Sequence, residues 1–76
     1  MSIEYNLNKL NGRIVEFCGT KQEFAKRMGT SKPTISKKLS NQIPFTQYEI
    51  SKACEILQIL PAEIGLYFFT EKVKSS

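Results

Sequence analysis

The chain has 76 residues, of which 41% are hydrophobic and 24% charged, a composition typical of one small folded domain. Eleven Lys and Arg side chains against seven Glu leave a formal net charge of +4, which suits an anionic partner such as nucleic acid. The sequence has no His, and therefore lacks the commonest general base and metal ligand. Its two cysteines, Cys18 and Cys54, form no Cys-x-x-Cys pair. We expect no enzyme, no metal site and no cofactor.

The cysteines and the N-terminal residues also indicate where the protein works. Cys18 and Cys54 fall within apolar helix faces, where a free thiol behaves as a small hydrophobe, so we expect buried thiols in a reducing compartment. Residues 1–5 lack the basic start and apolar core of a signal peptide. The apolar stretch over residues 56–69 is too short and too polar to cross a bilayer. We expect a soluble, cytoplasmic protein with no membrane contact.

The first predicted helix covers residues 7–18. Its apolar side chains recur at the spacing that places them on one stripe of a helix, namely Leu7, Leu10, Ile14 and Phe17. Gly19 follows at a position where glycine favours the end of a helix. Nowhere do apolar and polar residues alternate over a sustained stretch between hairpin turns, so strands are not expected.

Two short helices are predicted next, near residues 21–28 and 32–40. Thr20, followed three residues later by a glutamate, has the spacing of a capping box. Gly29 is suited to end the first of these helices, and Ser31 to cap the second. Their inward faces are expected to consist of Phe24, Ala25, Met28, Ile35 and Leu39.

The remaining elements are a helix near residues 47–58 and a short helix that starts at Pro61. Thr46 and Glu49 have the spacing of a second capping box. Proline is tolerated at the first helical position because its missing N–H has no helical partner there. Residues 70–76 are polar and are expected to fray. The sequence therefore predicts one all-α domain of five short helices that spans the whole chain.

Positive charge is concentrated in the second and third predicted helices. Residues 21–38 contain six Lys and Arg side chains and one Glu, whereas the rest of the chain contains five basic and six acidic side chains. One interpretation is a solvated face that keeps the protein soluble. The other is a helix-turn-helix, in which Ala25 lets the two helices cross closely at the Gly29-Thr30 turn and the second helix enters a DNA major groove.

Residues 21–36 (KQEFAKRMGTSKPTIS) resemble the helix-turn-helix of phage Cro and repressor proteins. The likeness extends through residues 45–50 (FTQYEI) to residues 66–69 (LYFF) and covers nearly the whole chain. The sequence is similar in particular to small Cro-like regulators of phages of Gram-positive bacteria. This resemblance implies a lambda-repressor-like DNA-binding domain, with double-stranded operator DNA as its partner.

The resemblance also implies which residues touch DNA. Lys32, Pro33 and Lys37 would contact base edges, where lysine suits guanine O6 and N7 and proline offers only apolar contact, for example to a thymine methyl. Thr34 and Ser36 flank these positions, and we expect them among the base contacts. Asn41 stands at a plausible left-handed stop of the recognition helix. Phosphate contacts are expected from Lys21, Ser31, Lys38, Ser40 and Asn41.

The expected function is transcriptional regulation, as a repressor that occludes a promoter. A homodimer on two half-sites about 34 Å apart is a further hypothesis. Two alternatives stay open: a protein-interaction module on a helix-turn-helix scaffold, and an architectural or excisionase-like DNA-binding protein. Tyr67, Phe68 and Phe69 are expected in the core, or with one ring exposed as a dimer surface. No small-molecule substrate is expected.

Overall fold

The computed structural model describes residues 4–71. In this part of the chain all helices are short, and the only β pairing is one isolated bridge. The elements are α1 (Asn8–Cys18), α2 (Lys21–Met28), α3 (Lys32–Leu39), α4 (Gln47–Leu57), η1 (Pro61–Glu63) and α5 (Ile64–Phe68). The expected all-α fold of five helices is confirmed, with Pro61 starting a single 3-10 turn that leads into α5.

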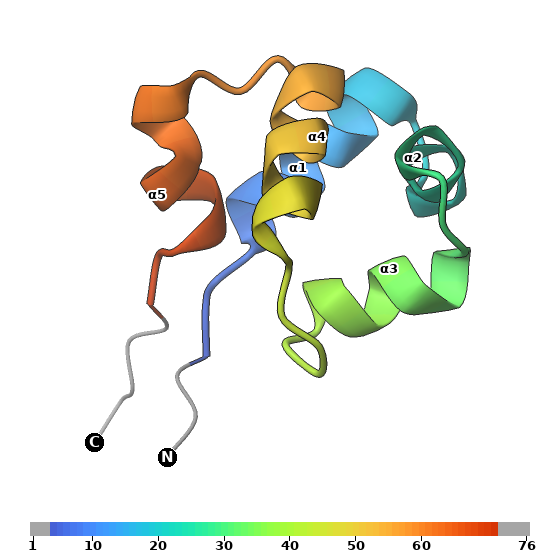
Figure 1. Ribbon diagram of the computed structural model, residues 1–76, viewed down its shortest axis with the longest axis horizontal. Coiled ribbons are helices and arrows are strands. Elements are labelled where there is room, and N and C mark those ends of the chain that lie inside the picture. Colours follow the sequence, from blue (N-terminus) through green and yellow to red (C-terminus); the bar gives the residue numbers. More distant parts are fainter. Residues whose placement is uncertain (1–3, 72–76) are drawn as a thin grey trace.

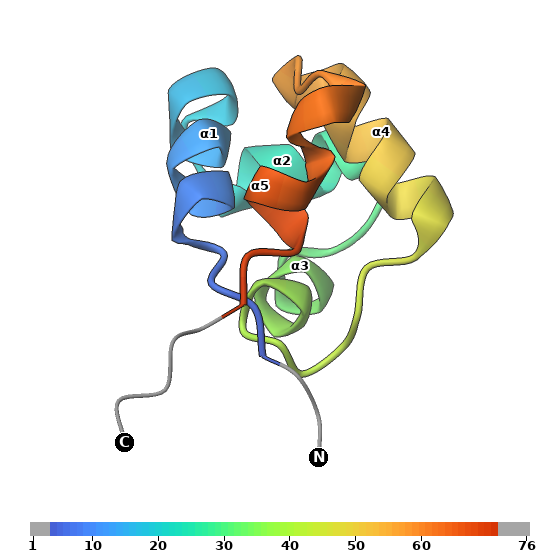
Figure 2. The ribbon, with the colours of Figure 1, turned by 90° about the vertical axis from the view of Figure 1, so that its left-hand side faces the viewer.

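The helices are arranged so that α3 lies at one end of the domain. In Figure 1, α1 and α4 pack together in the middle, with α2 on one side and α5 on the other. In this view α3 runs along the lower edge of the helices, and in the perpendicular view of Figure 2 it is again the lowest helix, seen nearly end-on. It packs mainly against α2. One side of α3 therefore faces the core, and the other faces away from the domain.

The core is built from the apolar stripes of the helices. Every residue expected on the inward faces of α2 and α3 is buried. In α5, Tyr67 and Phe68 are also buried, whereas Ile64 is half-buried. The largest fully buried side chains come from four helices and are Leu10, Ile14, Phe24, Ile35 and Leu57. Since burying one such side chain contributes about 1.5–3 kcal/mol, this cluster holds α1–α4 together.

Three helices end with a residue in the left-handed conformation: Gly29 (φ 78°), Asn41 (φ 67°) and Gln58 (φ 54°). In each case the next amide donates to the carbonyl five residues back, at 2.9 Å, from Thr30 to Ala25, Gln42 to Lys37 and Ile59 to Cys54. This bond satisfies a carbonyl that the helix leaves without a partner. The stops at Gly29 and Asn41 were expected, whereas Gln58 carries no such sequence signal and ends α4 at Leu57.

The two expected capping boxes differ in the structure. The box at α4 is complete, because Thr46 Oγ1 accepts from the Glu49 amide (3.1 Å) and Glu49 Oε1 accepts from the Thr46 amide (2.8 Å). At α2 only half of it forms. Thr20 Oγ1 accepts from the Glu23 amide (3.1 Å), but Glu23 Oε2 accepts from Arg27 Nε (3.0 Å) instead of reaching back. The carboxylate prefers the charged partner one helical turn away.

The two ends of the described chain are paired with each other. Tyr5 and Glu71 form the isolated antiparallel bridge, and the Asn6 amide donates to the Thr70 carbonyl (2.6 Å). Thr70 and Glu71 are therefore held in place, contrary to the expectation of fraying. The other residues of that expectation, 72–76, lie outside the described part.

Both cysteines carry free thiols and are half-buried rather than fully buried. Burial raises the pKa of Cys18 and of Cys54, which disfavours the reactive thiolate at neutral pH. No helix within residues 4–71 is long and apolar enough to cross a membrane.

Candidate nucleic-acid interface

The α2–α3 unit, residues 21–39 with their connecting turn, is held rigidly by local and core contacts. Gly29 adopts the left-handed conformation at the turn, which a residue with a Cβ adopts at a cost. Ser31 then caps α3, with its Oγ accepting from the Thr34 amide at 3.4 Å. Phe24 and Ile35 anchor the two helices in the core, and Ala25 is only 1% exposed beside them. The chain thus fixes two short helices across one tight turn.

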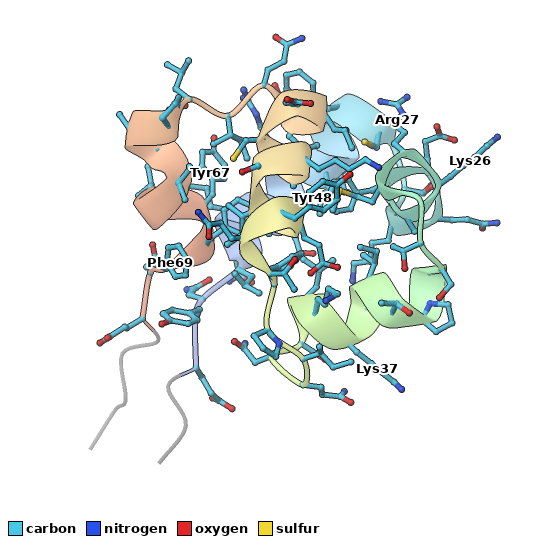
Figure 3. All side chains as sticks on the ribbon, in the orientation of Figure 1. Lys26, Arg27, Lys37, Tyr48, Tyr67 and Phe69 are labelled. Atoms are coloured by element: carbon cyan, nitrogen blue, oxygen red, sulfur yellow. The ribbon has the colours of Figure 1, made fainter. Side chains whose placement is uncertain are left out.

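Four lysines of the α2–α3 unit form what we call the lysine face: Lys21, Lys26, Lys32 and Lys37. All four are exposed, and none has an ion pair with any residue from 4 to 71. Figure 3 shows Lys37 extending from α3 away from the domain and Lys26 extending outward from α2. Arg27 differs, because its guanidinium is paired with Glu23. The lysine face therefore carries four cations that no carboxylate within residues 4–71 neutralises.

The residues expected to contact bases lie on or beside the outer side of α3. Lys32, Pro33 and Lys37 are exposed, whereas Thr34 and Ser36 are half-buried. The hydroxyl of Thr34 lies 2.9 Å from that of Ser31, so its rotation is tied to the cap of the helix. The structure thus leaves Lys32, Pro33 and Lys37 accessible on α3 and half-buries Thr34 and Ser36.

The residues expected to contact phosphates divide into two groups. Lys21, Ser31 and Ser40 are exposed. Lys21 starts α2, where free backbone amides also favour an anion. Ser40 follows α3, and its Oγ donates to the Lys37 carbonyl at 3.1 Å. These three positions remain accessible to a nucleic acid backbone.

Lys38 is buried, and the expectation that it contacts a phosphate is wrong. It is 6% exposed, and its Nζ lies 2.8 Å from Glu49 Oε1 and 3.3 Å from the Pro44 carbonyl oxygen. The reason is the register of the helix, since Lys38 and Leu39 follow Ile35 by three and four positions and so share its buried side. The ammonium is used inside the protein and does not belong to the lysine face.

The side chain of Asn41, expected to contact a phosphate, has a partner inside the fold. Its side-chain Oδ1 accepts from the Tyr5 amide and its Nδ2 donates to the Tyr5 carbonyl, both at 3.0 Å. The amide group therefore pairs with the backbone of the N-terminal segment in the manner of a strand. No sequence signal marks this partner, which lies 36 positions away in the chain. Asn41 closes the fold at this end, and the second N–H of its Nδ2 is the side-chain donor that Tyr5 does not use.

Sequence reasoning missed two residues of α4 beside the turn. Lys52 Nζ lies 3.6 Å from the position that a Cβ would occupy on Gly29. The same ammonium is 6.0 Å from the ring centroid of Tyr48, which is 72% exposed. The spacing of four residues between Tyr48 and Lys52 is a weak sequence signal that the two side chains share a helix face. Lys52 adds a further positive charge next to the α2–α3 unit.

A second surface of different character lies beyond the C-terminal end of α3. Here the N-terminal segment, the loop over residues 40–46 and α5 enclose a hollow of about 350 Å³. Its aromatic lining includes two edge-to-face pairs, Tyr5 with Phe69 (5.5 Å between centroids) and Phe45 with Phe68 (5.4 Å). Ile43 and Phe69 at this hollow are 38% and 47% exposed. Of the C-terminal aromatic run, Phe69 is therefore the exposed ring.

The chain belongs to the family described as "Protein of unknown function (DUF739)", which it matches over residues 1–71. Among solved structures, it is similar to the solution structure of the modulator of repression (MOR) of the temperate bacteriophage TP901-1 from Lactococcus lactis. The two chains are 41% identical, with a TM-score of 0.79, and the match covers 92% of this chain and 95% of that one. No curated protein matches.

These similarities make the protein a homologue of a phage regulatory protein. The expected relation to phage regulators is confirmed at that level. The family that matches is DUF739, however, and not the Cro and repressor family that residues 21–36 resemble.

Proposed function

We propose that this protein is a phage transcriptional regulator that binds double-stranded DNA through its α2–α3 unit. The observation that carries this proposal is the lysine face, whose exposed ammonium groups have no ion-pair partner within residues 4–71. Ile35, fully buried, anchors the opposite side of α3. A rigid helix that presents unneutralised cations at the end of a domain is suited to a major groove.

Each expected DNA-contacting residue that remains accessible has a chemical role in this proposal. Lys32 and Lys37 donate to guanine O6 and N7, and Pro33 packs against a thymine methyl. Lys21 binds a phosphate at the start of α2, where the helix dipole adds attraction. Ser31 and Ser40 are further phosphate contacts from the two ends of α3. Thr34 and Ser36 complete the set at the edge of the base-contacting surface.

The regulatory outcome is proposed from the similar phage protein. That protein is a modulator of repression, so we infer that this chain acts on repression in the cytoplasm of the host cell. Bound at an operator, a domain of this size would occlude a promoter. Two copies on half-sites about 34 Å apart would add specificity. The role is non-enzymatic.

A second candidate function, contact with another protein, is favoured by the aromatic hollow. Ile43 and Phe69 expose apolar surface next to it. Side chains of this kind anchor protein interfaces. Repression can be modulated either by occupying DNA or by contacting a DNA-bound protein, so the two candidates require different surfaces of the same domain.

Selection from random duplex DNA tests the first candidate. The wild-type protein is expected to enrich a short motif, and the Lys32→Ala variant is expected to lose preference at one or two of its positions. Lys9→Ala is a matched control, because Lys9 is an exposed lysine of α1 outside the lysine face. Failure of the wild-type protein to enrich any motif would exclude sequence-specific binding and favour the protein-contact candidate.

A further inference from the structure

The end of α3 is joined to the start of α4 by one ion pair, whose lysine is buried and whose glutamate is part-buried. Lys38 Nζ lies 2.8 Å from Glu49 Oε1, with side-chain exposures of 7% for Lys38 and 24% for Glu49. The same ammonium donates to the Pro44 carbonyl at 3.3 Å and lies 5.9 Å from the ring centroid of Phe45. Lys38 thus touches the loop over residues 40–46 as well as the next helix.

The carboxylate of Glu49 has two functions at the same oxygen. Its Oε1 accepts from Lys38 Nζ and, at 2.8 Å, from the backbone amide of Thr46. The capping box of α4 and the ion pair therefore share one atom. A displacement of the α3 end away from α4 would stretch the bond to Lys38, because the capping box holds the carboxylate in place.

The two ends of α3 are held in different ways. At its start, the turn and Ile35 fix it to α2, which is its main packing partner. At its end, the polar link to Glu49 adds to the packing of Leu39. A buried ion pair contributes little net stability compared with apolar residues, but a single unpaired charge there is strongly unfavourable. Such a pair therefore favours one geometry over others.

We propose that Lys38 and Glu49 are positioning residues for nucleic acid binding. Their ion pair sets the orientation of α3, and so the direction in which Lys32 and Lys37 leave the domain, without contact between Lys38 and DNA. The effect of this ion pair on DNA affinity rests on the proposed function. The effect of the ion pair on the orientation of α3 is measurable without DNA.

The test compares four variants with the wild-type protein, all confirmed as folded by circular dichroism at the assay temperature. Lys38→Met and Glu49→Gln each leave one charge without its partner. The double variant K38M/E49Q removes both charges, and glutamine keeps the capping-box bond to Thr46. Lys37→Met is the matched control, because it removes the neighbouring lysine from the exposed side of α3. Affinity for the selected duplex is measured against salt, and amide NMR shifts are recorded for residues 32–37.

We expect Lys38→Met to weaken binding roughly tenfold with the salt slope unchanged. The double variant, which also lacks the ion pair, should lie within about twofold of Lys38→Met. Lys37→Met should instead lower the preference for the selected duplex over one with an altered base pair. The amide shifts of residues 32–37 should move in Lys38→Met and stay displaced in the double variant.

Four results would overturn this proposal. A reduced salt slope in Lys38→Met and in the double variant would make Lys38 a direct phosphate contact, and wild-type affinity in the double variant would show that α3 is oriented without the ion pair. Wild-type affinity in folded Lys38→Met would leave the ion pair without a positioning role. If the wild-type protein binds no duplex, the proposed function fails, and unchanged amide shifts in Lys38→Met would then overturn the positioning role separately.

Discussion

The outer and inner sides of α3 carry the same kind of residue in opposite environments. Lys37 is exposed without an ion pair in the described part of the chain, whereas Lys38, the next residue, is 6% exposed and bound to Glu49. One position along a helix turns a side chain by about 100°, which here separates solvent from the interior. The charge available for binding is thus decided by helix register, and a count of basic residues overstates it.

The largest effect is expected when the inner side of α3 loses its anchor. Ile35→Ala should lower the free energy of unfolding by about 2–5 kcal/mol, because Ile35 is fully buried and its truncation leaves a cavity. Chemical denaturation of the variant and the wild-type protein measures the difference. A loss below about 1 kcal/mol would mean that α3 is anchored elsewhere and that its two sides are less distinct than the structure indicates.

A smaller effect of a different kind is expected on the outer side. Lys32→Ala should leave the unfolding free energy within about 0.5 kcal/mol of wild type, because the side chain is exposed. Its preference for the selected duplex over one with an altered base pair should fall by about 1–3 kcal/mol. Competition binding measures this preference. Retained preference in Lys32→Ala would place the base-reading surface elsewhere.

The smallest effect is expected from titration of the inner ion pair. Burial acts to raise the pKa of Glu49, but hydrogen bonds from Lys38 and Thr46 outweigh it, and the pKa lies below the usual glutamate range. A carboxyl group with a lowered pKa in the folded state stabilises the protein above its unfolded pKa, near 4.3, and this stabilisation disappears as the pH falls through the folded value.

Glu49→Gln should therefore show a weaker loss of stability between neutral pH and acid than the wild-type protein. Thermal melts over a pH series, with Glu55→Gln as a control on the exposed side of α4, test this difference. Identical pH profiles for Glu49→Gln and wild type would show that the ion pair does not contribute to acid sensitivity.

Local signals in the sequence were sufficient for most of the secondary structure. Ser31 and Thr46 accept the amide bonds expected of helix caps, and Asn41 has the left-handed conformation expected of a helix stop. These features depend on residues a few positions apart, so spacing reveals them. The apolar stripes predicted the core for the same reason.

The parts that the sequence did not reveal depend on contacts across the fold. The sequence predicts a phosphate contact for Lys38, because nothing in it indicates the partner Glu49, 11 positions away across an irregular loop. The pairing of Asn41 with Tyr5 spans 36 positions. Neither partner can be found without the path of the chain. Both errors concern polar residues, whose roles depend on their neighbours more than those of apolar residues do.

The most direct measurement of the central claim is the salt dependence of the affinity of the wild-type protein for duplex DNA. If Lys21 and Lys26, the two lysines of the lysine face that are not assigned to base edges, neutralise phosphates, log affinity should fall with log salt with a slope of about −1.8, or roughly 12-fold between 50 and 200 mM salt. An affinity for duplex DNA that is undetectable, or that does not change over this range, would contradict DNA binding by the α2–α3 unit.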